Sequence, residues 1–325
     1  MISRRKFLQA TIAGGAVLAL PQTRANLFSS TMWPSLSSPV LDLSSRETLI
    51  TILHTNDTHS QIDPLPDYDK QYGGKGGVAR RATLVKRVRK ENPNTLMIDA
   101  GDVFQGTPYF NFYKGEVEYK AMSLIGYDVG TLGNHDFDNG VDALVAAMKF
   151  ANFEFVSSNY DLRGTPLEKR VKRYTVRTFG DVRVGLFGMG VSPDNLITPA
   201  NFKGIKYLDP VASAREVVGI LRQRERCQLV VGMSHLGYYA NPKNGEIGDT
   251  QVAEQVDGID FIASGHTHTF MQTPVLARNP SGNNTIVFQV GKSGIYVGRV
   301  DFRMKNGRVI AAAGRLLDLR EESWS

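Results

Sequence analysis

From residue 47 onward, short apolar runs rich in β-branched residues alternate with segments of helical periodicity. This alternation is typical of α/β proteins, in which helices cover the faces of a sheet. The last predicted strands, within residues 285–317, follow one another closely and add antiparallel character. The predicted strands are residues 48–54, 95–99, 129–132, 153–157, 182–188, 229–234, 261–263, 285–290, 296–303 and 309–317.

Three segments between these strands have apolar residues at helical spacing. They begin near Val78, Val141 and Val211. Asp209 is the expected N-cap of the third helix, with Pro210 at its first position. This order of elements predicts a fold with strands in the middle and helices on the outside.

Side chains that bind metals come directly after five of the predicted strands. The carboxyl ends of strands form the ligand-binding edge of an open α/β sheet, so we expect these side chains to lie close together. Five of the six histidines belong to this group, and His54 is the exception. The group consists of Asp57, His59, Asp102, Asn134, His135, His235, His266 and His268.

A mixture of imidazole and carboxylate groups suits Zn, Mn or Fe. The single cysteine, Cys227, lies outside the group, which excludes a Cys-rich structural zinc site. With His135 set apart, seven plausible ligands remain. They are too many for one tetrahedral ion, and they suit two divalent metal ions that share a bridging ligand.

Five short blocks of this sequence, in this order and spacing, resemble the signature of the calcineurin-like metallophosphoesterases. Residues 51–59, 99–108 and 133–138 look like the 5′-nucleotidase branch of that family. The resemblance covers residues 47–319, which we take as the catalytic domain. The blocks are Asp57-Thr58-His59, Gly101-Asp102, Gly133-Asn134-His135-Asp136, Ser234-His235 and Gly265-His266-Thr267-His268.

The resemblance implies a four-layer α/β/β/α sandwich of mixed sheets, with a dinuclear metal site at the C-terminal ends of the strands. His268 stands where some periplasmic nucleotidases have Gln, a change expected to affect metal preference more than reaction type. The implied ligands are Asp57, His59 and His268 for one metal, Asn134, His235 and His266 for the other, and Asp102 as the bridge.

The resemblance also implies hydrolysis of phosphate monoesters by a hydroxide that bridges the two metals. His135 binds neither metal in this scheme, so it is expected to protonate the leaving oxygen or to stabilise its developing charge. Asp138, three residues later, is expected to hold and polarise the His135 imidazole. An alternative for Asp138 is the N-cap of the helix that follows it.

The N-terminus is predicted to be a targeting signal rather than part of the fold. Basic residues precede the apolar run 11–20, and small residues follow it, as in a secretory signal. The pair Arg4-Arg5 resembles a bacterial twin-arginine (Tat) signal, which implies a periplasmic or extracytoplasmic protein. An uncleaved anchor is the alternative. Residues 26–46, rich in Ser and Pro, are expected to form a linker, and residues 320–325 a C-terminal tail.

The net charge of +6 does not indicate nucleic-acid binding, because residues 1–25 contribute four basic residues and no acidic one. The remainder has 34 basic and 32 acidic residues, a net charge of +2. A phosphorylated small molecule, most simply a nucleotide, is the expected substrate. A separately encoded C-terminal nucleotide-binding domain is a candidate partner. Alternatives are a cyclic-nucleotide phosphodiesterase, a thiosulfohydrolase and a non-enzymatic phosphate binder.

Overall fold

The computed structural model describes residues 47–239 and 246–319, and two large mixed sheets form the middle of this part. In the first sheet, the five strands β1, β2, β3, β4 and β6 run parallel to one another. Strand β14 pairs antiparallel with β1, and β15 pairs antiparallel with β14. In order across this sheet the strands are β15 (Arg308–Asp318), β14 (Tyr296–Lys305), β1 (Glu47–Thr55), β2 (Thr95–Asp99), β3 (Val129–Gly130), β4 (Glu154–Val156) and β6 (Val171–Lys172).

The second sheet has a parallel centre and an antiparallel strand at each edge. Its strands, in order, are β12 (Val275–Arg278), β13 (Asn284–Phe288), β11 (Phe261–Ser264), β10 (Leu229–His235), β8 (Val182–Gly190) and β7 (Tyr174–Phe179). A small separate pair is formed by β5 (Tyr160–Asp161) and β9 (Lys206–Tyr207).

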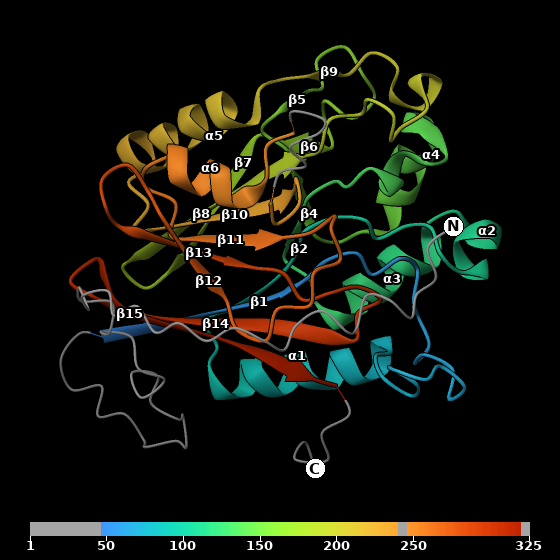
Figure 1. Cartoon of the computed structure of the whole chain (residues 1–325), viewed down its shortest axis with the longest axis horizontal. Helices are drawn as coiled ribbons and strands as arrows, with labels where there is room; N and C mark the ends of the chain where they lie inside the picture. The colour runs from blue at the N-terminus through green and yellow to red at the C-terminus, as the bar shows by residue number, and fades with distance from the viewer. Residues whose placement is uncertain (1–46, 240–245, 320–325) are drawn as a thin grey trace, which may run out of the picture. The chain divides into compact units, whose positions relative to one another are not determined.

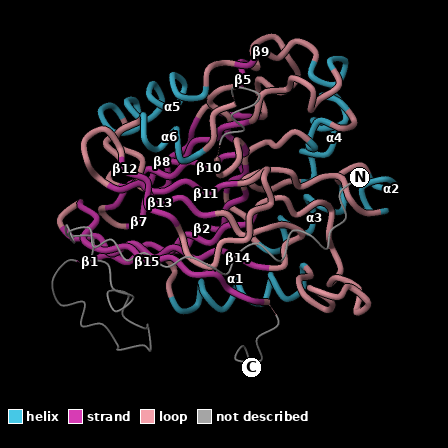
Figure 2. Tube along the Cα trace, in the orientation of Figure 1, coloured by secondary structure: helices cyan, strands magenta, loops and turns pink. Residues whose placement is uncertain are grey.

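Helices cover the outer faces of both sheets, and Figures 1 and 2 show the strands between two helical layers. Apolar residues of α1 and α3 pack in one core with residues of the first sheet, and those of α5 and α6 pack with the second sheet. The helices are α1 (Val78–Glu91), α2 (Pro108–Tyr113), α3 (Glu116–Ile125), α4 (Gly140–Ala147), α5 (Pro210–Gly219) and α6 (Asp249–Gln255).

A third apolar core lies between the two sheets. Ile52 and Ile98 of the first sheet belong to the same buried cluster as Leu186, Val231 and Phe261 of the second. Burial of apolar surface of this kind is the main favourable term in folding. The expected four-layer α/β/β/α sandwich of mixed sheets is confirmed.

All ten predicted strands are present, with ends that differ by up to two residues. The predicted cap of α5 is also confirmed, because Oδ1 of Asp209 accepts a hydrogen bond of 2.7 Å from the backbone N–H of Ala212. Helices α2, α3 and α6 and strands β5, β6, β7, β9 and β12 were not predicted.

The predicted signal (1–25), linker (26–46) and tail (320–325) lie outside the described residues. Within the part that is described, no helix is long and apolar enough to cross a membrane.

Candidate metal centre

The carboxyl ends of strands from both sheets bring the predicted metal ligands into two groups. Each group has three side chains whose ligand atoms all lie within 4.8 Å of one another. We call them the open cluster and the buried cluster. The open cluster is Asp57, His59 and His268, and the buried cluster is Asp102, His235 and His266.

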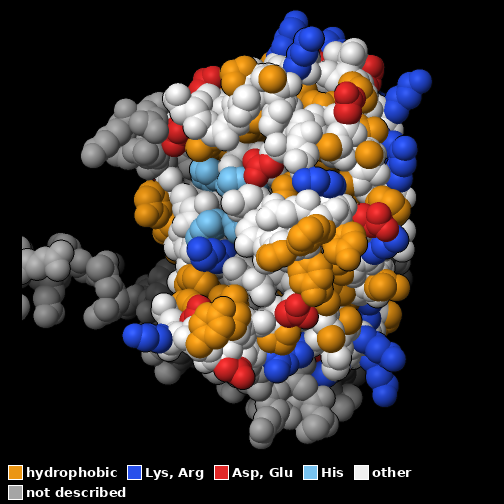
Figure 3. Space-filling view, turned by 90° about the vertical axis from the view of Figure 1, so that its right-hand side faces the viewer, with side chains coloured by type: hydrophobic (Ala, Val, Ile, Leu, Met, Phe, Trp, Pro, Cys, Tyr) orange, Lys and Arg blue, Asp and Glu red, His pale blue; other side chains and the backbone are white. Residues whose placement is uncertain are grey.

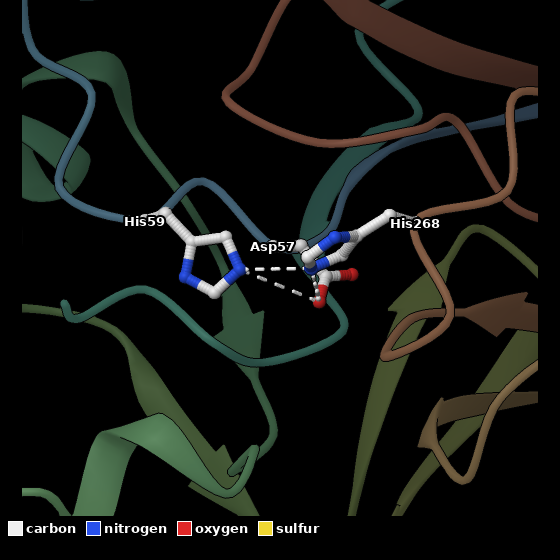
Figure 4. Close-up of side chains that lie close together, drawn as sticks. All are labelled: Asp57, His59 and His268. Carbon is white, nitrogen blue, oxygen red and sulfur yellow. Dashed lines mark hydrogen bonds and ion pairs between the residues drawn. The ribbon is translucent and has the colours of Figure 1, made fainter. Parts of the chain in front are cut away.

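The open cluster joins the loop after β1 to the loop after β11 (Figure 4). Nε2 of His59 lies 2.9 Å from Nε2 of His268. Oδ1 of Asp57 lies 3.2 Å from Nε2 of His268 and 3.9 Å from Nε2 of His59. Three ligand atoms therefore face a common point. Histidine side chains reach the surface together on the face shown in Figure 3.

The buried cluster lies beside the open one. Oδ2 of Asp102 is 3.0 Å from Nε2 of His235, which in turn is 3.8 Å from Oδ1 of Asp57. Oδ1 of Asn134 lies 3.1 Å from Nδ1 of His266, so the predicted amide ligand is also present. The structure thus brings all seven predicted ligands into one continuous site.

The ring of His235 fits a metal ligand better than a core histidine. Its Nδ1 lies 2.7 Å from the carbonyl oxygen of Ala100, which places the proton on Nδ1. Its Nε2 is buried, no side-chain or backbone donor reaches it, and the carboxylate of Asp102 lies 3.0 Å away. With the proton on Nδ1, the buried Nε2 of His235 can only accept. A cation placed between it and the two buried carboxylates of Asp57 and Asp102 would satisfy all three groups. His59 has a similar arrangement, with Nδ1 3.2 Å from the carbonyl oxygen of Phe104.

The backbone is strained at five of the predicted ligands. Asp57, His59, Asp102, His266 and His268 all have positive φ, between 48° and 72°. Non-glycine residues adopt this left-handed conformation at a cost in free energy, and such residues cluster at functional sites.

Close approach of the loops also requires glycine. A Cβ atom on Gly133 would overlap Oδ1 of Asp102, and one on Gly265 would lie 2.8 Å from Nδ1 of His235. Any side chain at either position would displace a ligand.

Burial and charge shift the pKa values of the buried cluster in opposite directions. Burial lowers the pKa of His266 to about 4. Burial would also lower that of His235, but the carboxylates of Asp102 and Asp57 together raise the pKa of His235 to about 10. In the same pair, His235 holds the pKa of the buried Asp102 below its usual value, against the effect of burial.

His135 and Asp138 lie at the edge of the site, on the short 3₁₀ helix η1 (His135–Phe137) and the residue after it. Nδ1 of His135 is 3.0 Å from Oδ2 of Asp138, and this hydrogen bond raises the pKa of His135. The His135 ring lies 5.5 Å from that of His59. Asn139, rather than Asp138, is the N-cap of α4, so capping does not account for Asp138.

Two further residues that shape the site were not predicted. The buried carboxylate of Asp136 accepts hydrogen bonds from the backbone N–H groups of Asp102 and Gly133, at 3.1 and 2.8 Å. The amide of Asn56 donates to Oδ2 of Asp57 at 2.6 Å. Asn56 directly follows β1, and Asp136 lies in the block Gly133-Asn134-His135-Asp136. Their positions just after predicted strands were the only sequence signal that could have identified them.

Comparison with known proteins agrees with this geometry. Residues 50–270 match the profile of the family described as calcineurin-like phosphoesterase. The chain belongs to the calcineurin-like phosphoesterase family. Family members use a dinuclear metal site, and the open and buried clusters agree with it. Membership places the chain among metal-dependent phosphoester hydrolases, as the resemblance implied.

Several characterised or solved proteins are similar to this calcineurin-like phosphoesterase. A 5′-nucleotidase of Bos taurus is 30% identical over 318 residues, which are 90% of this chain and 52% of the relative. The crystal structure of a 5′-nucleotidase precursor from Thermus thermophilus is 32% identical, with a TM-score of 0.74, over 83% of this chain and 54% of that one.

A third similar protein is the calcineurin-like phosphoesterase YfkN from Bacillus subtilis. Its crystal structure is 26% identical, with a TM-score of 0.68, and the match covers 84% of this chain and 91% of the crystallised one. By contrast, the chain spans about half the length of the curated 5′-nucleotidases that it matches.

Proposed function

We propose that this calcineurin-like phosphoesterase hydrolyses phosphate monoesters, with nucleotides as the substrates, in the manner of a 5′-nucleotidase. The observation that carries the proposal is the adjacency of the open and buried clusters, with the His135–Asp138 pair at their edge. The names of the relatives from Bos taurus and Thermus thermophilus support a nucleotide substrate.

The proposed ligand assignment follows the two clusters. Asp57, His59 and His268 would hold one divalent ion, and Mn, Zn and Fe are the candidate metals. Asn134, His235 and His266 would hold the other, and Asp102 would serve both. When bound, such a pair of ions activates water and offsets the negative charge of a phosphate.

The protein's own side chains then orient the ester and supply a proton. The hydrogen bond to Asp138 fixes the Nδ1–H of His135, so Nε2 is the atom that faces the leaving oxygen. The His135 side chain is 35% exposed, which leaves room for a substrate beside it. His135 is therefore the proposed proton donor and Asp138 the residue that orients it.

We also propose export and a partner for substrate recognition. Residues 1–25 act as a Tat-type signal that directs the chain out of the cytoplasm, followed by the linker 26–46. Replacing Arg4 and Arg5 with Lys should stop this export, which cell fractionation would show. A separately encoded nucleotide-binding domain is the proposed partner, since the match to the Bos taurus 5′-nucleotidase covers 52% of that relative.

Phosphate release tests the proposed activity. Residues 26–325 are assayed metal-free and with Mn²⁺ on AMP, an aryl phosphate monoester and a phosphate diester, with Asp102→Asn as the inactive control. Metal-dependent release from AMP supports a nucleotidase that reads its substrate unaided, and release from the aryl monoester alone indicates that the partner supplies specificity. Phosphate release from the diester alone would contradict the monoesterase assignment. No release from any of the three substrates would contradict the proposal that the protein is a phosphoesterase.

A further inference from the structure

Gln289 is a buried polar residue that has no part in the proposed ligand set or in proton transfer. It directly follows β13, and its side chain is fully buried. Strand β13 pairs in parallel with β11, the strand that precedes His266 and His268. Gln289 therefore stands at the same sheet edge as the metal ligands, one strand away from the loop that carries two of them.

All four hydrogen-bonding positions of the Gln289 amide are used on residues 264–269. Nε2 donates to Oγ of Ser264 at 2.8 Å and to the carbonyl oxygen of Gly265. Oε1 accepts from Oγ1 of Thr267 at 3.0 Å and from the backbone N–H of Thr269. A primary amide offers two donor hydrogens and two acceptor positions, so nothing is left for other partners.

The loop needs such support because its two ligands are strained. His266 has φ of 72° and His268 has φ of 52°. A non-glycine residue stays in this conformation only when the surrounding structure holds it there. The contacts of Gln289 reach the residues before, between and after the two histidines, so they restrain the backbone on both sides of each.

We propose that Gln289 is the positioning residue for both metals. The inference rests on the ligand assignment of the proposed function, in which His268 belongs to the open cluster and His266 to the buried one. A single amide thus holds one ligand of each ion. Loss of its hydrogen bonds should weaken both metal-binding steps together, unlike loss of a ligand that serves one ion.

The test is Mn²⁺ binding to Gln289→Met, a variant that keeps an unbranched side chain but loses the amide. Isothermal titration of metal-free protein should show both Mn²⁺ equivalents bound about 10–100-fold more weakly, the usual effect of losing a partner that orients metal ligands. The electron paramagnetic resonance signal of the coupled Mn²⁺ pair should change as well, which a purely structural role would not cause.

Gln228→Met is the matched control. The Gln228 amide also bonds to backbone groups, the N–H of Arg183 at 2.7 Å and the carbonyl of Arg226 at 2.8 Å, but it precedes β10 and lies at the opposite end of that strand. This control should bind both equivalents as the wild type does. Thr267→Val, which removes one contact of Gln289, should weaken both steps by less and serves if Gln289→Met does not fold.

The inference would be overturned if folded Gln289→Met bound both Mn²⁺ equivalents with wild-type affinity. If only Thr267→Val folds, wild-type affinity in that variant would overturn it. Either result would leave the proposed function standing. Weakening of one equivalent alone would also overturn the inference, since the proposal links the two steps. A wild-type protein that binds no pair of Mn²⁺ ions would overturn the ligand assignment itself, so the two failures are distinguishable.

Discussion

The open and buried clusters have the same kinds of donors but different access to solvent. In the open cluster, the His268 side chain is 35% exposed, although Asp57 is fully buried. In the buried cluster, the side chains of His235 and Asp102 are 0% and 2% exposed. Solvent therefore reaches His268 of the open cluster but not His235 of the buried one. The two metal positions should therefore differ in exchange and in their tolerance of substitution.

We also expect the two clusters to have different roles in the proposed reaction. The His135 ring lies 5.5 Å from that of His59 in the open cluster, so under the proposed function we expect the leaving group of the substrate on that side. In the buried cluster, the Gly133 and Gly265 backbones pack directly against Asp102 and His235, although His266 is only partly buried. We expect the buried position to hold its ion through the reaction cycle and the open position to meet the substrate first.

The largest effect should come from Asp102→Asn, because Asp102 is the ligand that the proposed function assigns to both metal positions. The neutral amide cannot offset the charge of two cations, so both should be lost and turnover should fall close to background. Metal analysis and phosphate release measure the two losses on the same sample. Retention of both metals with normal turnover would show that Asp102 is not the shared ligand.

The next largest effect should come from His135→Ala. Loss of the proposed proton donor should lower the rate by about 10²–10⁴-fold while both metals stay bound, since His135 is in neither cluster. Asp138→Asn should cost less, because the imidazole remains. Turnover and metal content of both variants check this order. Loss of metal from His135→Ala would place His135 among the ligands.

A direct comparison of the clusters comes from His235→Gln and His268→Gln. Solvent does not reach His235, so His235→Gln should bind its metal about 10-fold more weakly than His268→Gln binds its own, as metal environments commonly shift affinity by 10–100-fold. Competition with a chelator measures both affinities. Equal losses would mean that burial does not distinguish the two positions.

The smallest effect concerns His54, a histidine that is buried without being a ligand. Its two ring nitrogens have no hydrogen-bond partner, and burial lowers its pKa to about 3. The folded state keeps the ring neutral, whereas the unfolded chain takes up a proton near its ordinary pKa of about 6.5. The stability that His54 contributes is therefore present above pH 6.5 and is lost as the pH falls towards 3.

His54→Leu should remove the contribution of this one proton to the pH dependence of the free energy of unfolding. Urea unfolding of metal-free protein at pH 7.5 and 5 should show a smaller fall in the free energy of unfolding for the variant than for the wild type. Metal binding at pH 7.5 should be unchanged, because the ring contacts Phe261 and Phe288 rather than the clusters. If the free energy of unfolding fell equally in both proteins, His54 would not contribute to the pH dependence of stability.

The strands and the ligand edge could be predicted from sequence because both are local patterns. Asp57 and His235 are recognisable from what precedes them, an apolar run that ends in a polar residue. Strand β7 was missed because its burial is irregular along its length, and β12 because it is a short edge strand.

Asp136 and Gln289 could not be given roles from sequence. Asp136 bonds to the backbone of a loop more than thirty residues away, and Gln289 to a loop on a neighbouring strand. Such roles depend on which loops the fold brings together. The alternative role of Asp138 as an N-cap was likewise decided by where α4 begins, since helix ends are the least predictable part of a pattern.

The most direct test of the account is anomalous diffraction from crystals of this protein prepared with Mn²⁺. The account predicts two peaks about 3.5–4 Å apart, one among Asp57, His59 and His268 and one among Asn134, His235 and His266, with Asp102 touching both. A single peak, or two peaks that do not share Asp102, would contradict it.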